Sequence, residues 1–337
     1  MTSRALLFGA LLVAMLAHPA FAACQFLKVA SPTALVENNR LYLPGRLNGQ
    51  DILFFVDTGA QISLILPAGA KKLGLNVLTT QGHLMGATGH PVQLYRARIE
   101  SISLGDWVGR DFDLMVAGDG ENFGHERAVL LLGADFLRQF DIEMDLTAGI
   151  VNLFKPQGCE DAKLAYWTDR DNEADMIGSY TDSGHVLLHP KVNDVELTAM
   201  LDSGASLSVL TDSAASRAGG FGPDSPGVTA AGPVAGIGGV KAQSWLATFA
   251  GFTLDQEVIK PAKLRFFQFG RAESDLRNHI DSSMEEIDML LGLDFIHAHH
   301  ILISNSQRKV YFTYSGGAPF EKTWPRSGNW EASATGR

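Results

Sequence analysis

The amino-acid sequence predicts an all-β protein in which one chain forms two similar lobes. Three observations support this fold class. A short motif occurs twice, a second motif follows each copy in the same order, and most apolar runs are short or alternating. Repetition of this kind indicates a duplicated structural unit, and short runs bounded by Gly, Asn, Asp or Pro are typical of β-strands. A chain of 337 residues is long enough for two such units.

The first 23 residues have the pattern of a secretory signal peptide, with a basic start, an apolar run at 5–16 and a small-x-small cleavage site at 20–22. A membrane anchor is the alternative. It would need about 20 apolar residues, and His18 and Pro19 interrupt the run too early. We therefore expect an exported protein, periplasmic or secreted, and leave residues 1–23 out of the fold.

The chain has two cysteines, Cys24 and Cys159. Outside the cytoplasm two cysteines can pair, and this pair would tie the start of the mature chain to the end of the first lobe. The alternative is a lipid anchor on Cys24, for which Phe21 is an unfavourable residue three positions earlier. The two fates exclude each other, because a thioether sulfur cannot join a disulfide.

The first repeated motif is an apolar run that ends in Asp-Thr/Ser-Gly-Ala. It reads FFVDTGA around Asp57 and AMLDSGA around Asp202. The surrounding stretches 46–65 and 191–210 correspond end to end. Asn-Gly and Asn-Asp pairs at 48–49 and 193–194 predict matching hairpin turns within them.

The second motif is an apolar run that ends in glycine, LLLGADFL at 130–137 and LLGLDFI at 290–296. A short helix is expected after Gly133 and after Gly292. Asp135 and Asp294 recur two positions after these glycines, and we expect them to cap the short helices rather than to act in catalysis.

The remaining pattern is mostly β. Strands are expected at 51–56, 96–104, 111–117, 150–154, 185–192, 195–201 and 309–314, and further short helices at 67–75 and 212–220. The predicted organisation is a signal peptide at 1–23, a first lobe at 24–155, a linker at 156–183, a second lobe at 184–314 and a tail at 315–337.

Composition excludes several partner classes. The net charge of −10 argues against nucleic acids and anionic membrane surfaces, which both require a basic face. No later apolar run is long enough for a membrane span. No metal, nucleotide or organic cofactor is indicated.

Two Asp-Thr/Ser-Gly loops that face each other can support hydrolytic chemistry. Each strand holds its carboxylate at the end of a rigid element, and the glycine permits a sharp turn and a close approach. The hydroxyls of Thr58 and Ser203 can hydrogen-bond to the opposite loop. Two adjacent carboxylates share one proton, so one can act as a base on water while the other polarises a carbonyl.

With both motifs in order, the chain resembles the retropepsin-like aspartic proteases. The resemblance rests on Asp57 to Ala60, Asp202 to Ala205 and the two glycine motifs, and it covers most of the mature chain. It implies two β-barrel lobes with a central cleft, a catalytic pair formed by Asp57 and Asp202, and a polypeptide substrate. Because one chain holds both lobes, a monomer would suffice for activity.

The resemblance also implies roles for other residues. Active-site loop support falls to Thr58, Gly59, Ser203 and Gly204. The candidate flaps that would close over the peptide are Gly86, Ala87, Thr88, Gly89, Gly236, Ile237, Gly238 and Gly239. Tyr95 follows the first glycine-rich segment, whereas a pepsin-like flap tyrosine would precede it.

Other interpretations remain open at this point. Asp57 and Asp202 could close turns, the glycine-rich segments could be plain hairpins, and the scaffold could bind peptides without cleaving them. The histidines at 297, 299 and 300 permit a metal-dependent hydrolase. An exposed turn that varies between the repeats is the simpler account of these histidines.

Overall fold

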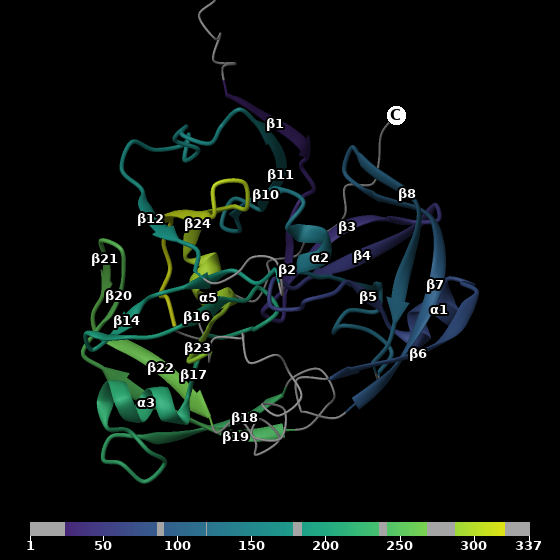
Figure 1. The fold of residues 1–337 in the computed structure, drawn as a ribbon. Helices are drawn as coiled ribbons and strands as arrows, with labels where there is room; N and C mark the ends of the chain where they lie inside the picture. The colour runs from purple at the N-terminus through teal and green to yellow at the C-terminus, as the bar shows by residue number, and fades with distance from the viewer. Residues whose placement is uncertain are drawn as a thin grey trace, which may run out of the picture.

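A computed structural model describes residues 24–85, 91–118, 120–177, 184–235, 241–267 and 287–320. The predicted signal peptide, the eight candidate flap residues and most of the predicted tail lie outside these ranges. The described chain is mostly β-structure with a few short helices, as predicted (Figure 1). No helix in these ranges combines the length and the apolar character that a membrane span would require.

The first lobe is an eight-stranded sheet with the order β2-β3-β4-β9-β5-β8-β7-β6. Its strands are β2 (Leu35–Glu37), β3 (Arg40–Leu47), β4 (Gln50–Val56), β5 (Leu64–Ile65), β6 (Val77–Met85), β7 (Pro91–Leu104), β8 (Trp107–Val116) and β9 (Ala128–Leu132). The helices are α1 (Pro67–Lys72) and α2 (Ala134–Leu137). Both were predicted, one after each motif.

The second lobe contains a seven-stranded sheet and a four-stranded sheet. The first has the order β13 (Leu187–Leu188), β16 (Ala199–Leu201), β23 (Met289–Leu291), β17 (Val209–Thr211), β22 (Ala262–Phe267), β19 (Lys241–Phe249) and β18 (Thr229–Ala235). The second has the order β15 (Val195–Glu196), β14 (Lys191–Val192), β20 (Phe252–Leu254) and β21 (Glu257–Ile259). The helices α3 (Asp212–Gly219) and α5 (Leu293–His297) occupy the predicted positions.

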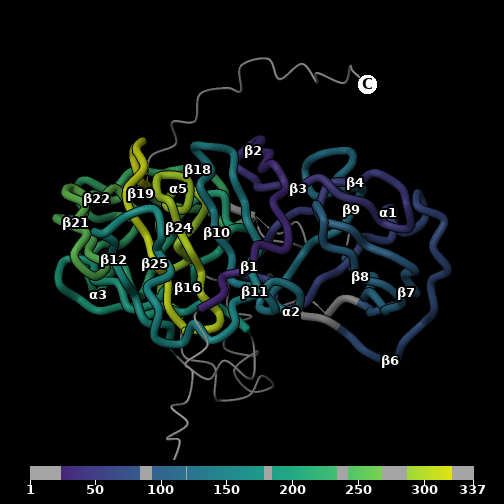
Figure 2. Tube along the Cα trace, turned by 90° about the horizontal axis from the view of Figure 1, so that it is seen from above, coloured from purple at the N-terminus to yellow at the C-terminus, as the bar shows by residue number. Residues whose placement is uncertain are grey.

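A six-stranded sheet joins the two halves, and the sequence did not predict it. Its order is β1 (Gln25–Ala30), β11 (Ile150–Gln157), β10 (Asp141–Asp145), β24 (His299–Ser304), β25 (Lys309–Tyr314) and β12 (Asn172–Asp175). The junction is the antiparallel pair β10–β24, where Ile142 faces Ile303. In Figure 2 β1, β10 and β11 lie between the first lobe on the right and the second on the left, and β12 and β25 overlap the second lobe. The predicted linker therefore contributes β12 as an edge strand.

The same local structure recurs around each Asp motif. A tight hairpin precedes it, with Asn48 and Gly49 at φ 46° and 78° and with Asn193 and Asp194 at φ 49° and 64°. Two consecutive positive φ values define the turn that matches strand twist, and Asn, Asp and Gly tolerate them best. The strand after the turn then pairs in parallel with the strand of the glycine motif, β4 with β9 and β16 with β23.

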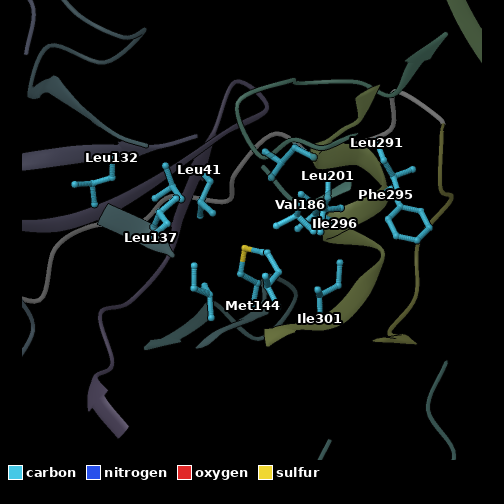
Figure 3. Packing of buried hydrophobic residues seen from close by; sticks show 14 of the residues in the cluster. Leu41, Leu132, Leu137, Met144, Val186, Leu201, Leu291, Phe295, Ile296 and Ile301 are labelled. Atoms are coloured by element: carbon cyan, nitrogen blue, oxygen red, sulfur yellow. The ribbon is translucent and has the colours of Figure 1, made fainter. Parts of the chain in front are cut away.

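One hydrophobic core runs through both halves. Figure 3 shows Leu41, Leu132 and Leu137 from the first lobe and Val186, Leu201, Leu291, Phe295 and Ile296 from the second. Met144 of β10 lies between the two groups, and Ile301 of β24 faces it in the shared sheet. The lobes are thus joined by a continuous apolar interior as well as by backbone hydrogen bonds.

The structure joins Cys24 and Cys159 in a disulfide, with their Cα atoms 4.5 Å apart. The bond fastens the start of β1 to the segment that follows β11, so it ties the edge strand of the six-stranded sheet to its neighbour. A sulfur held in this bond cannot carry the alternative lipid anchor.

Candidate active site

The parallel strand pairs position the two aspartates. Asp57 directly follows β4, and its N–H donates a hydrogen bond to the carbonyl of Leu132 at 3.0 Å. Asp202 directly follows β16, and its N–H donates to the carbonyl of Leu291 at 2.9 Å. The apolar residue before each motif glycine therefore fixes the backbone of the aspartate in its own lobe.

The structure brings the two carboxyl groups together. A hydrogen bond links the carboxyls of Asp57 and Asp202. A Cβ added to Gly59 would lie 2.5 Å from Cγ of Asp202, and one added to Gly204 would lie 2.3 Å from Cγ of Asp57. Each glycine thus provides the space that the opposite carboxyl occupies. Only 7% of Asp57 and 8% of Asp202 is exposed, so the pair is largely withdrawn from solvent.

The residues after the aspartates form a symmetrical brace. The Thr58 hydroxyl donates to the carbonyl of Leu201 at 2.6 Å and accepts from the Ser203 N–H at 2.9 Å. The Ser203 hydroxyl donates to the carbonyl of Val56 at 2.9 Å and accepts from the Thr58 N–H at 3.1 Å. All four hydrogen bonds are buried and cross from one loop to the other, so the brace fixes the carboxyls relative to each other.

The motif glycines permit a close backbone crossing behind each loop. A Cβ on Gly133 would lie 2.6 Å from the carbonyl carbon of Ile62, and one on Gly292 would lie 2.6 Å from that of Leu207. Only glycine fits at such a distance. The N–H groups of the next residues, Ala134 and Leu293, donate to the carbonyls of the motif alanines.

Sequence reasoning missed two supporting serines, Ser63 and Ser208. The Ser63 hydroxyl accepts from the N–H of Gly133 at 2.9 Å and donates to Asp135 Oδ1 at 2.6 Å. Ser208 makes the same two bonds, to Gly292 and Asp294, at the same distances. The two serines occupy matching positions of the aligned stretches 46–65 and 191–210, and that recurrence was the available signal.

The predicted helix-capping role of Asp135 and Asp294 is wrong. The residues at the caps of α2 and α5 are Gly133 and Gly292, and neither helix has a side-chain cap. The aspartate carboxylates instead accept from the serine hydroxyl and N–H and from the N–H of the following residue. They therefore anchor the loop after each aspartate of the dyad, because the serine on that loop donates both its N–H and its hydroxyl to the carboxylate.

Burial and mutual repulsion shift the titration of the dyad. Burial raises the pKa of Asp57 well above its usual range, and the neighbouring charge of Asp202 raises it further. Burial also raises the pKa of Asp202, while hydrogen bonds from the N–H groups of Gly204 and Ala205 oppose that shift. The pair consequently retains a proton to higher pH than two separate aspartates would.

The expectation of an exposed histidine turn is wrong. His299 is fully buried, and its ring nitrogens contact the carbonyl of Phe295 and Glu257 Oε1. His300 contacts Glu143 Oε1 at 2.8 Å and stacks on Trp167, and burial lowers the pKa of His297 to about 4. The three residues end α5 and begin β24, where the second lobe enters the shared sheet. In the part of the chain that the structure describes, no three His, Cys, Asp or Glu residues are grouped to hold a metal ion.

Two protein-family models match the chain, one over each lobe. A family model described as "gag-polyprotein putative aspartyl protease" matches residues 43–139, and one described as "Aspartyl protease" matches residues 188–295. The first range contains Asp57 and the second contains Asp202.

Curated relatives are distant and longer. Protein DDI1 homolog 2 of Mus musculus is 26% identical over 155 residues, which is 42% of this chain and 37% of that protein. DNA damage-inducible protein 1 of Yarrowia lipolytica is 28% identical over 119 residues, 34% of this chain and 28% of that protein. The chain thus spans about a third of the length of the curated relatives it matches.

Two solved structures are also similar. A retropepsin-like aspartic protease from Rickettsia conorii is 19% identical with a TM-score of 0.29, covering 40% of this chain and 95% of that one. The aspartic proteinase from Irpex lacteus is 11% identical with a TM-score of 0.49, covering 87% of this chain and 97% of that one. Two family matches in succession, each containing one aspartate of a converging pair, identify the chain as a member of the retropepsin-like aspartic protease family.

Proposed function

We propose that the protein is an aspartic endopeptidase in which Asp57 and Asp202 form the catalytic dyad. One observation carries the proposal: two buried carboxyls, one from each lobe, are hydrogen-bonded to each other, and burial raises the pKa of both. Such a pair holds one proton over a broad pH range, so it offers a base and an acid at the same place.

In the proposed reaction the ionised carboxylate takes a proton from a water molecule, and the resulting hydroxide attacks the carbonyl carbon of the peptide bond. The protonated carboxyl donates its proton to the carbonyl oxygen, which gives a tetrahedral diol. The carboxyl that took the proton from water then protonates the amide nitrogen, and a hydroxyl of the diol gives its proton to the other carboxylate as the C–N bond breaks. The products are a carboxylic acid and an amine, and the dyad is back in its one-proton state.

The brace around Thr58 and Ser203 supports this mechanism, because proton transfer requires the carboxyls to keep hydrogen-bonding distances to the water and the substrate. The substrate is an extended polypeptide, held partly by strand-like backbone pairing. Since one chain supplies both aspartates, a monomer suffices. The signal-peptide pattern of residues 1–23 supports an exported protein, periplasmic or secreted.

The test compares the purified mature protein with the variants Asp57→Asn and Asp202→Asn on a denatured protein mixture, with products identified by mass spectrometry. Wild type is expected to cleave and both variants to lose cleavage. Asp51→Asn serves as the matched control, because Asp51 is exposed on the same lobe and pairs with Arg46. Thermal melts verify that each variant folds.

Equal cleavage by wild type and by Asp57→Asn would overturn the assignment. Peptide binding without cleavage by wild type would favour a binding protein on the same scaffold. Loss of activity with a chelator and its return with zinc would favour the metal-dependent alternative.

A further inference from the structure

Each lobe presents one sheet face to the dyad. In β4 the side chains of Phe54 and Val56 enter the main core, whereas Phe55 does not. Side chains alternate along a strand, so Phe55 lies on the face that carries Asp57. By the same alternation Met200 lies on the face that carries Asp202, opposite the core residue Leu201 (Figure 3). We call these surfaces the dyad faces.

Strand register defines a matching row of four residues across each dyad face. In the first lobe Phe55 faces Leu131, Leu131 faces Leu64 and Leu64 faces Met115. Every member of this row is apolar, and the row packs in one small hydrophobic cluster with Tyr42.

The row of the second lobe begins in the same way. Met200 faces Leu290, Leu290 faces Val209 and Val209 faces Arg265. The corresponding four strands of the second lobe, β16, β23, β17 and β22, supply it in the same order. Arg265 therefore occupies the position that Met115 has in the first lobe, and the two dyad faces differ there by a positive charge.

The surroundings of Arg265 leave that charge available. Its neighbours Leu264 and Phe266 enter the core, so its own side chain lies on the dyad face. Its Nη1 donates to the carbonyl of Ala231 at 2.6 Å and to the Ser244 hydroxyl at 2.8 Å, both neutral acceptors.

No carboxylate within the described residues pairs with Arg265, and its Nε and Nη2 donate no hydrogen bond there. The charge that acts on it from a distance is that of Asp294, whose carboxylate is engaged by Ser208 and Phe295. A half-buried guanidinium with unused donors matches the planar geometry of a carboxylate.

We propose that Arg265 makes the substrate subsite on the second lobe selective for an acidic side chain, Asp or Glu. This inference rests on the proposed function. Adjacent strands lie about 4.8 Å apart, so Arg265 is about 14 Å across the sheet from Met200. An extended peptide rises about 3.3 Å per residue, which puts the acidic position within about four residues of the scissile bond.

The experiment measures kcat/KM on a peptide library in which each of four positions on either side of the cleavage site carries Asp, Glu, Asn, Gln, Leu or Lys. Wild type is expected to prefer Asp or Glu at one position on one side. Arg265→Met, which copies the residue of the first lobe, should lose about ten-fold or more on those peptides and keep its rate on the Leu peptides. Arg265→Lys keeps the positive charge but loses the planar guanidinium that can bind a carboxylate through two hydrogen bonds, so it should retain part of the preference for Asp or Glu.

Arg98→Met is the matched control, because Arg98 is exposed on β7 and pairs with Asp113. It should leave the profile unchanged. An equal loss on all peptides in Arg265→Met would overturn the inference, since it would show that Arg265 only supports the β18–β19 hairpin. An unchanged profile in a folded Arg265→Met or Arg265→Lys variant would also overturn it. Absence of cleavage by wild type would instead overturn the proposed function and the inference with it.

Discussion

Ser63 of the first lobe holds the carboxylate of Asp135, which is exposed, whereas Ser208 of the second lobe holds that of Asp294, which is buried. The hydrogen bonds are the same and their surroundings are not. The lobes agree where their loops meet, at Thr58 and Ser203, and differ across the dyad faces, where Met115 is replaced by Arg265. Duplication has therefore kept the geometry of the dyad and left the surfaces around it free to diverge.

The largest effect is expected from adding a methyl group at Gly59 or Gly204, where each lobe leaves space for the carboxyl of the other. Gly59→Ala and Gly204→Ala would each put a methyl group within 2.6 Å of an opposite carboxyl atom. Because a displacement of about 1 Å can cost about 100-fold in rate, both variants should lose about 100-fold in kcat/KM. Gly222→Ala is the control, with its nearest atom at 3.8 Å. Full activity in either dyad variant would contradict the geometry.

The disulfide is a covalent difference between the halves, because it ties down only the first one. Cys24→Ser with Cys159→Ser opens a loop with a sequence separation of 135 and should lower the free energy of unfolding by about 2–5 kcal/mol. Urea unfolding measures the loss, and reduction of the wild type should reproduce it. Hydrogen exchange should increase more in β1 and β11 than in β16; uniform exchange would refute this local role.

The pH dependence of stability tests the shared proton. The pKa of Asp57 is raised in the folded chain by burial and by Asp202, whereas in the unfolded chain it lies near 4, about its usual value. Above that pH the folded state binds more protons, so stability falls as the pH rises through the raised folded pKa. Asp57→Asn should therefore match wild type in urea unfolding below about pH 4 and gain on it at higher pH. A pH-independent difference would show that the pair holds no shared proton.

Ser63 and Ser208 make the same hydrogen bond to an aspartate, so substituting each one should show how burial changes the contribution of that bond to stability. Ser208→Ala removes a donor from a buried carboxylate and should lower the free energy of unfolding by about 1–3 kcal/mol. Ser63→Ala removes a donor from an exposed one, which water can replace, so about 0.5–1.5 kcal/mol is expected. Urea unfolding of both variants decides the order. A larger loss in Ser63→Ala would reverse the comparison.

The smallest effect is expected at the two hairpins that precede the motifs. Arg46 and Asp51 form an exposed ion pair in the first, and Lys191 faces Glu196 at the corresponding positions of the second. Asp51→Ala and Glu196→Ala should each change the free energy of unfolding by less than about 1 kcal/mol, because exposed pairs contribute little. A loss above that value at either hairpin would show that it stabilises its lobe more than exposure suggests.

Much of the fold and the convergence of the aspartates could be predicted from sequence. Strand alternation and turn chemistry are local properties, so the hairpins at Asn48 and Asn193 and all four expected helices were confirmed. The meeting of Asp57 and Asp202 followed from the repetition of two motifs in order, because a duplicated loop has a matching loop to meet.

Properties that depend on long-range packing could not be predicted. Nothing local in β10 or β24 specifies that they pair with each other, and β12 is too short to stand out in a polar segment. His299 is polar and was expected in solvent, yet its contacts with Glu257 and the carbonyl of Phe295 allow full burial. The role inferred for Arg265 could not be predicted from the sequence, because it depends on the strand register that places Arg265 opposite Val209.

The pairing of β10 with β24 has a consequence for the evolution of the chain. If the halves were expressed as separate polypeptides, each would expose a bare row of backbone N–H and C=O groups along that seam, together with Met144 or Ile301. Exposed strand edges of this kind pair with strands of other molecules, which leads to aggregation. Separate halves would therefore have to re-form this strand pairing with each other to cover the seam, a requirement that a single polypeptide meets within one chain.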